Sequence, residues 1–199
     1  MLQTPLRDQL TTTEHALLGM LARYGEHSGY ELLKLAESGV AYLWSPAKSH
    51  VYDVLPRLER SGHARRRLVP QTGKPDKHLW RITDRGRRAL TTWVNTVDSD
   101  SLSNRGVLLL KIFFGEYGDP ERLIAHLEDF RAQAEAKLAD LRAIERQPTV
   151  RPDDELPLIT LRQGLAGTEA QLQWSQDALV QLRARAARRS IAAGLPAPQ

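Results

Sequence analysis

The hydrophobic period of the chain changes after Gly62, and this change limits its possible folds more than any other feature. Up to that point, apolar residues recur at intervals of three and four in segments that end at Gly25, Gly39 and Gly62. Beyond it, residues 64–70 and 78–83 are short strand-like runs joined by a connection that contains Gly and Pro. Such a connection predicts a hairpin loop longer than two residues. Three helices followed by a β-hairpin are therefore expected.

Helix-capping patterns predict where these helices begin. Thr11 followed by Glu14, and Ser28 followed by Glu31, have the spacing of a capping box, in which each side chain bonds the other residue's backbone amide. Proline is tolerated in the first turn of a helix, so the Ser-Pro pair at residues 45–46 predicts the start of the third helix.

Two further features complete the predicted first half. Pro56 lies inside the third helical pattern and is expected to kink that helix or loosen its last turns. Thr83 or Asp84 is expected to cap a fourth helix. Three helices, a hairpin and a closing helix make a winged helix-turn-helix. The fold class is therefore predicted to be mainly α, with this domain over residues 10–97.

The second half is predicted to be almost entirely helical beyond a linker at residues 98–104. A short apolar helix is expected over residues 107–114, and a long helix from Asp119-Pro120 to about Gln147. A loop rich in Pro and Asp, residues 148–157, separates the long helix from a last one.

The last helix carries apolar and small residues at alternating steps of three and four, which is typical of a coiled-coil-like seam. The leucines expected to hold a dimer are Leu158, Leu161, Leu165, Leu172, Leu179 and Leu182. A homodimer built by a helical domain over residues 105–188 is predicted, because three helices have little else to cover this stripe. A helical hairpin packed within one subunit is the alternative. Residues 189–199 are expected to form a disordered tail.

The charge is unevenly distributed along the chain. Residues 1–95 carry 15 Lys+Arg and 9 Asp+Glu, whereas residues 96–199 carry 13 and 15. Within residues 57–88 the counts are 11 and 3. Such a concentration of positive charge suits a phosphate backbone, because each neutralised phosphate releases condensed counterions. A basic surface that is merely solvated is the alternative.

The third helix and the hairpin supply most of the candidate DNA-binding residues. Short hydroxyls and a lysine at a helix start can reach base edges or phosphates in the major groove. The candidates are Ser45, Lys48, Ser49, His50, Tyr52 and Asp53 on the third helix, Tyr30 and Lys34 on the second, and Arg65, Arg67, Lys74 and Lys77 on the hairpin. For Tyr52, burial with a satisfied hydroxyl is slightly favoured over DNA contact.

The arginine triplet cannot act as a single unit. Strand alternation directs Arg65 and Arg67 to one face of the hairpin and Arg66 to the other. Asp76 in the loop works against phosphate binding there.

Several classes of protein are excluded by what the sequence lacks. It has no cysteine and no HExxH, phosphate-loop or GxSxG motif, and its six histidines show no ligand spacing. No enzyme, catalytic residue, metal or cofactor is therefore expected. The start of the chain has no signal-peptide character and no run is long enough to span a membrane, so a cytoplasmic protein without a membrane partner is expected.

At this level of detail the sequence resembles the PadR family of bacterial regulators over residues 15–90. The motifs that carry the resemblance are Gly29-Tyr30-Glu31-Leu32, Trp44-Ser45-Pro46, the pattern Tyr52, Leu55, Arg57-Leu58-Glu59 and Gly62, and Thr83-Asp84-x-Gly86. The second half, with LLLKIFFG at residues 108–115 and Leu172-Gln173-Trp174, is similar to the longer subfamily with a helical dimerisation domain.

The resemblance implies a function as well as a fold. It implies a repressor that binds double-stranded operator DNA as a homodimer through the third helix and wing. It also implies that a small aromatic or apolar effector, or another signal, relieves repression. The candidate pocket residues for an effector are Trp44, Trp93, Phe113, Phe114, Tyr117 and Trp174. Asp76 stands where the family wing often has a second basic residue. The alternative function is a protein-interaction module of winged helix and coiled coil, without an effector.

Overall fold

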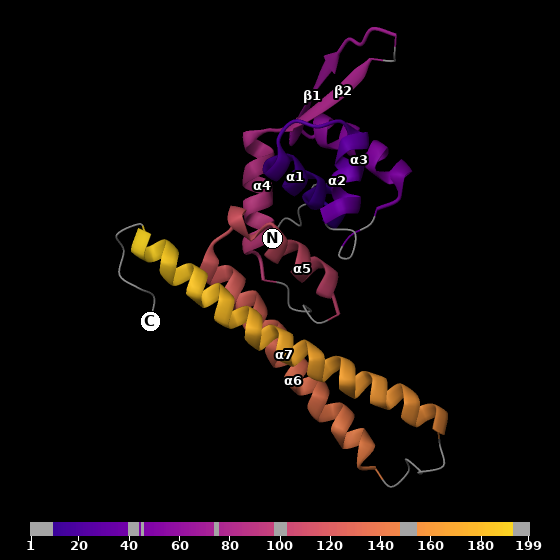
Figure 1. Cartoon of the computed structure of the whole chain (residues 1–199), viewed down its shortest axis with the longest axis vertical. Helices are drawn as coiled ribbons and strands as arrows, with labels where there is room; N and C mark the ends of the chain where they lie inside the picture. Colours follow the sequence, from indigo (N-terminus) through magenta and orange to yellow (C-terminus); the bar gives the residue numbers. More distant parts are fainter. Residues whose placement is uncertain are drawn as a thin grey trace, which may run out of the picture. The chain divides into compact units, whose positions relative to one another are not determined.

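The computed structural model describes residues 10–39, 44, 46–73, 76–97, 103–147 and 155–192. The chain divides into two compact units (Figure 1). The first comprises Met1–Thr96 and Leu109–Gly118, and the second comprises Val97–Leu108 and Asp119–Gln199. Ser45, Lys74 and most of the predicted linker and of the loop at 148–157 lie outside the described residues.

The first unit is a winged helix-turn-helix, as predicted. It holds α1 (Thr12–Tyr24), α2 (Gly29–Gly39), α3 (Lys48–Arg60), β1 (Ala64–Val69), β2 (Lys77–Ile82) and α4 (Asp84–Asn95). Its core consists of apolar residues from every helix, among them Leu17, Leu18, Leu32, Val51, Leu55, Leu58 and Leu90. The two strands form the wing, an antiparallel hairpin that extends away from α1–α4 (Figure 1).

The predicted capping boxes are both present. The Thr11 hydroxyl accepts from the Glu14 amide at 3.3 Å, and Glu14 Oε2 accepts from the Thr11 amide at 2.7 Å. Ser28 and Glu31 repeat this exchange at the start of α2, at 3.3 and 2.9 Å. These bonds satisfy amides that a helix start leaves without an intrahelical partner.

Thr83, not Asp84, caps α4. Its hydroxyl accepts from the Gly86 amide at 3.1 Å and donates to the His63 carbonyl oxygen at 3.0 Å. Gly86 is required by this packing, because a Cβ there would lie 2.2 Å from the same carbonyl oxygen. The Thr-Asp-x-Gly sequence therefore joins the wing to α4 in a tight turn.

The third helix starts two residues later than predicted, about half a turn. α3 begins at Lys48, after Ala47, whose ψ of 140° is not helical and whose side chain makes no cap bond. Pro56 does not end the helix, because α3 continues through it to Arg60; the predicted kink stays a prediction. The buried side chains of Leu55 and Leu58 hold these turns in the core, and tertiary packing of this kind outweighs one lost backbone donor.

The first unit includes part of the segment that was predicted to belong to the second domain. α5 (Arg105–Phe113) is followed by a 3₁₀ turn, η1 (Gly115–Tyr117), and residues from Leu109 onward belong to the winged-helix unit. The buried ammonium of Lys111 donates to the Thr96 carbonyl oxygen at 2.6 Å. The Phe114 ring is also buried, against Gly19 of α1. A sequence linker at 98–104 therefore does not mark the division between the two units.

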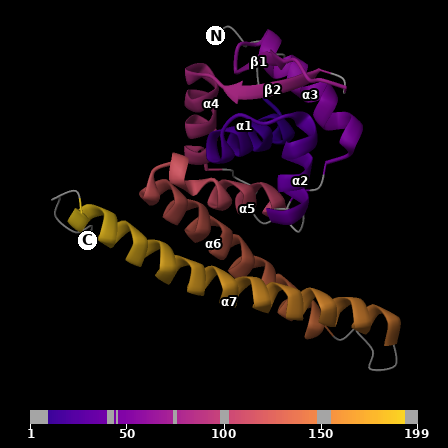
Figure 2. The same cartoon turned by 45° about the horizontal axis from the view of Figure 1, so that its top comes forward.

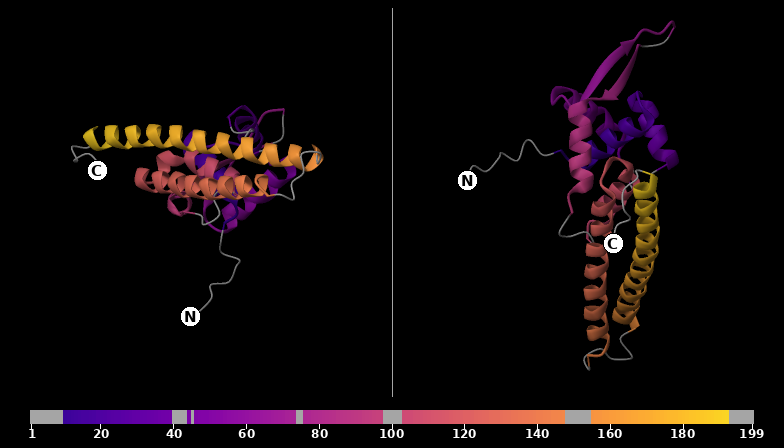
Figure 3. Two further views of the ribbon diagram at one scale, coloured as in Figure 1. Left: turned by 90° about the horizontal axis from the view of Figure 1, so that it is seen from below. Right: turned by 90° about the vertical axis from the view of Figure 1, so that its left-hand side faces the viewer.

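The second unit is built on a long helical hairpin. α6 (Pro120–Glu145) and α7 (Glu155–Ala192) lie side by side along most of their length (Figures 2 and 3). α6 begins at the predicted Asp119-Pro120 pair, and the Asp119 carboxylate caps it by accepting from the Glu121 amide. Phe130 and Trp174 meet edge to face with ring centroids 5.5 Å apart, and Arg142 pairs with Glu169 at 3.1 Å.

The stripe on the last helix packs against α6 of the same chain. Thr168, Ser175, Leu179 and Ala186 are buried, opposite the apolar face of α6 that includes Phe130, Ala134 and Leu138. The other predicted dimer leucines are half-buried: Leu158, Leu161, Leu165, Leu172 and Leu182. The packing within one chain therefore accounts for much of a pattern that was interpreted as a seam between two chains.

The ends of α7 also differ from the prediction. It begins at Glu155, inside the expected loop at 148–157, and it continues to Ala192, four residues into the expected tail at 189–199. Residues 193–199 lie outside the described part of the chain.

Candidate nucleic-acid interface

The outer surface of α3 presents most of the residues predicted to read DNA. The side chains of Lys48, Ser49, His50, Tyr52 and Asp53 are all exposed to solvent. Val51, Val54, Leu55 and Leu58 point into the core. This division follows the 3.6-residue period of the helix and leaves one polar face of α3 open to a partner.

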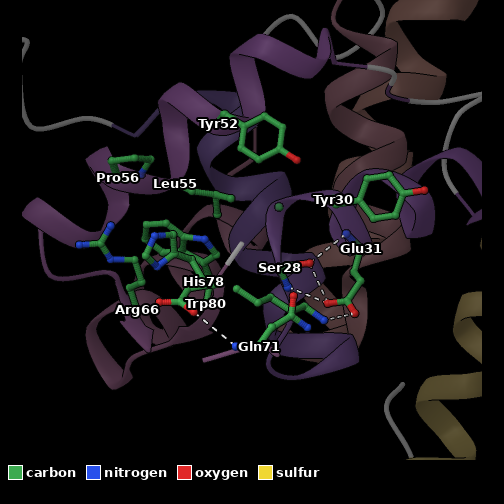
Figure 4. Close-up of a pocket in the computed structure, with 13 residues that line it drawn as sticks. Ser28, Tyr30, Glu31, Tyr52, Leu55, Pro56, Arg66, Gln71, His78 and Trp80 are labelled. Carbon is green, nitrogen blue, oxygen red and sulfur yellow. Dashed lines mark hydrogen bonds and ion pairs between the residues drawn. The ribbon is translucent and has the colours of Figure 1, made fainter. Parts of the chain in front are cut away.

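Tyr52 is not buried, contrary to the slightly favoured expectation. Its side chain is 45% exposed, and its ring lies beside Gly29, where a Cβ would come within 2.9 Å of Tyr52 Cε1. Gly29 thus permits the ring to lie across the start of α2. Tyr30 is also exposed, so two phenol groups border the same region of the surface (Figure 4).

A groove of about 540 Å³ lies between the start of α2, the middle of α3 and the wing (Figure 4). Tyr52 and Pro56 line it from α3, and Arg66, His78 and Trp80 line it from the wing. Its walls combine aromatic rings and hydroxyl groups with two cations, Arg66 and Lys77, and two carboxylates, Glu31 and Asp76. A surface of this kind can accept an anionic chain whose backbone needs hydrogen-bond donors.

The arginine triplet divides between the two faces of β1 as predicted. Arg66 pairs with Trp80 across the hairpin and lies over its ring, 5.8 Å from the centroid, on the side that lines the groove. Its guanidinium is 3.5 Å from Glu59 of α3. Arg67 instead forms an ion pair with Glu26. Arg66, which was not among the predicted DNA-binding residues, is therefore the member of the triplet that borders α3.

Lys77 is held by α2. Its ammonium donates to Glu31 Oε1 at 2.6 Å, and both side chains are about one-third exposed. The hydrogen bond from Lys77, followed by those from Ser28, lowers the pKa of the Glu31 carboxyl to about 2. Glu31 is thus fully ionised near neutral pH. The predicted wing cation already has a carboxylate partner inside the domain.

Two other cations extend the polar face of α3. A shallow pocket of about 470 Å³ is lined by His50, Asp53, Arg57 and Arg60, with Tyr52 and Pro56. Arg57 lies 3.8 Å from Glu14 and Arg60 is exposed. Neither was predicted as a site residue. Arg57 follows Asp53 by four residues and Arg60 follows Arg57 by three, and this spacing would have placed them on the same helical face.

The aromatic residues proposed for an effector pocket are divided between the two units. Trp93 stacks on His15, with ring centroids 4.8 Å apart, and the Lys111 ammonium lies 5.4 Å from its ring centre. Phe113 and Phe114 meet edge to face, and Tyr117 follows in η1. The remaining two are Trp44, which is half-buried, and Trp174, which packs on Phe130 in the second unit. An effector site made of all six stays a prediction.

The described residues contain no group of three or more His, Cys, Asp or Glu side chains that could hold a metal ion. Among these residues, no helix combines the length and the apolar character that a membrane crossing requires.

Comparison with known proteins decides the family. A model described as "Transcriptional regulator PadR-like family" matches residues 17–92, and one described as "Virulence activator alpha C-term" matches residues 104–183. Residues 17–92 of the chain therefore form a PadR-like regulator domain. Both the predicted family and the predicted fold class are thereby confirmed, and this PadR-like protein is a regulator, not an enzyme.

Individual relatives cover most of the chain. The PadR-like protein is 28% identical over 177 residues to the probable transcriptional regulator Rv1176c of Mycobacterium tuberculosis, covering 82% of this chain and 93% of that one. It is 27% identical over 128 residues to the negative transcriptional regulator PadR of Bacillus subtilis, covering 64% and 70%. A crystal structure of Bacillus subtilis PadR in complex with operator DNA is 24% identical, covers 86% of this chain and 99% of that one, and has a TM-score of 0.41.

Proposed function

We propose that this PadR-like regulator binds double-stranded operator DNA, with α3 in the major groove and the DNA backbone in the groove between α3 and the wing. The observation that carries this proposal is that Tyr52 of α3 and Arg66 of the wing line one groove, while the exposed Lys48 lies about one turn before Tyr52 on α3. A recognition helix followed by a basic hairpin suits base contacts from the helix and phosphate contacts from the hairpin.

Specific base reading is assigned to the first exposed turns of α3. Lys48 and Ser49 can donate to acceptors in the major groove, and the Asp53 carboxylate can accept from a base amino group. The Tyr52 hydroxyl and the Arg66 guanidinium line the same groove and are placed to contact one stretch of phosphates. Together these residues would fix the register of the helix on the duplex.

We further propose that two copies bind together through α7. Ile159, Val180 and Ile191 are 60%, 68% and 71% exposed. They are spaced so that they fall on nearly the same face of α7, roughly opposite the face that packs on α6. A second copy that covers this face would form a homodimer, and its two winged helices would match half-sites about one helical turn apart.

Repression is the favoured outcome of DNA binding. The negative transcriptional regulator PadR of Bacillus subtilis supports this assignment by similarity. Release by a small aromatic or apolar effector, and action in the cytoplasm, belong to the same proposal.

The proposal is tested by binding to a duplex that the protein itself selects from a randomised library. Affinity for this duplex should fall at least about 100-fold between about 50 and about 200 mM salt, because phosphate contacts release counterions. Lys48→Glu should weaken the selected duplex about 10- to 100-fold and a scrambled duplex much less. Fluorescence anisotropy measures both.

The matched control is Lys137→Glu, the same charge change at an exposed residue of α6. It should leave the preference for the selected duplex unchanged. If no duplex is enriched, or if affinity does not depend on salt, the protein does not act through DNA. An inert Lys48→Glu variant would move the reading residues away from the start of α3.

A further inference from the structure

The wing is joined to the segment before α2 as well as to α3. His27 and Trp80 exchange two backbone hydrogen bonds, at 3.1 Å from the His27 amide and 2.8 Å from the Trp80 amide. Three residues earlier on β2, Lys77 donates to Glu31 in the first turn of α2. Strand β2 is therefore attached at two points to one short stretch of chain.

Glu31 binds the start of α2 and the wing at the same time. Its Oε2 accepts from the Ser28 amide and hydroxyl, each at 2.9 Å, which completes the capping box of α2. Its Oε1 accepts from Lys77. One carboxylate oxygen of Glu31 thus binds the start of α2, and the other binds the wing. Figure 4 shows Glu31 and Ser28 at the edge of the groove that α3 and the wing enclose.

We propose that Glu31 is a positioning residue that fixes the wing for operator binding by holding Lys77 against α2. This inference rests on the proposed DNA-binding function. It assigns to Glu31 a role in specificity, because the place of the wing relative to α3 decides which phosphates and bases Arg66 and Tyr52 can reach together. An acidic residue on a surface that binds a polyanion would otherwise weaken binding.

The other ion pairs of the winged-helix unit are less suited to this role. Arg67, which pairs with Glu26, is 60% exposed, and solvated pairs contribute little to order. Lys34 and Glu37 lie on the same helix, three residues apart, so their pair cannot connect α2 to the wing. Arg66–Glu59 also joins the wing to a helix, but its two atoms are 3.5 Å apart, whereas those of the Glu31–Lys77 pair are 2.6 Å apart.

Replacing Glu31 by an uncharged residue separates a positioning role from a purely electrostatic role, because the two predict opposite changes in DNA affinity. Glu31→Gln raises the net charge by one, so a purely electrostatic role predicts tighter binding to every duplex. A capping box accepts Gln in place of Glu, which preserves the start of α2. Its single amide oxygen cannot serve both Ser28 and Lys77, so the wing would lose its attachment. A positioning role therefore predicts weaker binding to the selected duplex.

The matched control is Glu37→Gln, which makes the same charge change on the same helix and breaks a pair that does not reach the wing. Affinities for the selected and scrambled duplexes are measured by fluorescence anisotropy. Glu31→Gln should bind the selected duplex about fivefold more weakly than Glu37→Gln does, with no loss on the scrambled duplex. In a Lys77→Met background, Glu31→Gln should cause no further loss, because the pair is already absent.

A second measurement does not depend on DNA. Amide hydrogen exchange in the free protein should be faster at residues 77–80 in Glu31→Gln than in Glu37→Gln, because the attachment of β2 is weakened. Equal exchange rates, or equal affinities of the two variants for the selected duplex, would overturn the positioning role and leave the proposed function intact. If the unsubstituted protein selects no duplex, the proposed function fails, and the exchange rates alone decide whether Glu31 orders the wing.

Discussion

The two units of the molecule cover their apolar residues to different degrees. The winged-helix unit encloses Leu17, Leu18, Val51 and Leu90 and also buries polar side chains such as His15 and Lys111. In the hairpin unit, by contrast, α7 packs one face on α6 and leaves Leu156, Ile159, Val180 and Ile191 largely exposed. The first unit has a complete core of its own, whereas α7 carries isolated large apolar side chains that α6 does not cover.

This difference separates the sites at which the two units would act. The surface of the winged-helix unit is dominated by cations, several of them held by carboxylates that set where they point. The surface of α7 offers apolar area, which favours association because its burial removes it from water. A charged surface suits a nucleic acid, and exposed large apolar side chains on a helix suit a second protein chain.

The largest expected effect comes from placing charge on the open face of α7. The double substitution Ile159→Asp and Val180→Asp should raise the dissociation constant of the homodimer at least about 1,000-fold, because four carboxylates would be buried in a two-fold interface. Sedimentation velocity over a concentration series measures the dissociation constant. Both residues are exposed in the single chain, so the hairpin itself should keep its helical circular-dichroism signal.

The control for this substitution is Leu68→Asp, which places the same carboxylate at an exposed apolar residue of β1. It should leave the sedimentation coefficient unchanged. A double α7 variant that stays dimeric at the same concentrations would show that two copies associate elsewhere.

The next effect concerns the polar core of the winged-helix unit. Burial lowers the pKa of His15 from 6.5 to about 4. The hydrogen bond with the Thr11 backbone and the charge of Glu14 oppose this shift, and Lys111 and His63 add to it. The unfolded chain therefore takes up a proton at this residue near pH 6.5, and the folded chain only near pH 4. The free energy of unfolding should fall by up to about 3 kcal/mol as pH drops through this window.

Urea denaturation at about pH 7 and about pH 4.5, followed by tryptophan fluorescence, measures this loss. His15→Gln should make the free energy of unfolding depend less on pH, whether or not it changes that free energy near pH 7. His78→Gln, at an exposed histidine of β2, should leave the dependence as it is. The same slope in all three proteins would mean that His15 is not the residue whose protonation unfolds the unit. The pKa of His63 is also lowered by burial and should account for part of the remaining slope.

The fold of the first unit was predictable because its signals are local. The capping boxes at Thr11 and Ser28 and the change of period after Gly62 need no knowledge of the rest of the chain. The start of α3 was less predictable, since Ser45-Pro46 has helix-start character and only the path of the chain decides that the first turn forms at Lys48. The position of Leu109–Gly118 in the first unit depends on long-range contacts such as that of Phe114 with Gly19, which no local pattern indicates.

The stripe on the last helix shows a limit of a different kind. A spacing of three and four predicts that a helix face is covered, but it does not say by which chain. Leu179 is buried by the same chain, whereas Val180, one residue later and outside the predicted stripe, is exposed. In the candidate site, sequence alternation placed Arg66 correctly on its own face of β1, but only the fold shows that this face borders α3. The contact of Lys77 with Glu31 spans 46 residues and had no local signal.

The smallest expected effect compares two neighbouring arginines of the wing. Arg66→Ala and Arg67→Ala remove the same charge from the same strand, so a basic surface that attracts DNA only through its net charge would lose the same affinity in both. The fold predicts a difference. Arg66 lines the groove with Tyr52, and its contact with Glu59 is long, whereas Arg67 lies on the other face of β1 in an ion pair with Glu26.

Arg66→Ala should therefore weaken binding to the selected duplex about tenfold and lower the salt slope by about one, and Arg67→Ala should weaken this binding about twofold at most. Anisotropy titrations at several salt concentrations measure both quantities. Equal losses would mean that the groove beside α3 does not hold the DNA backbone, and that the wing contributes charge without contributing a defined contact.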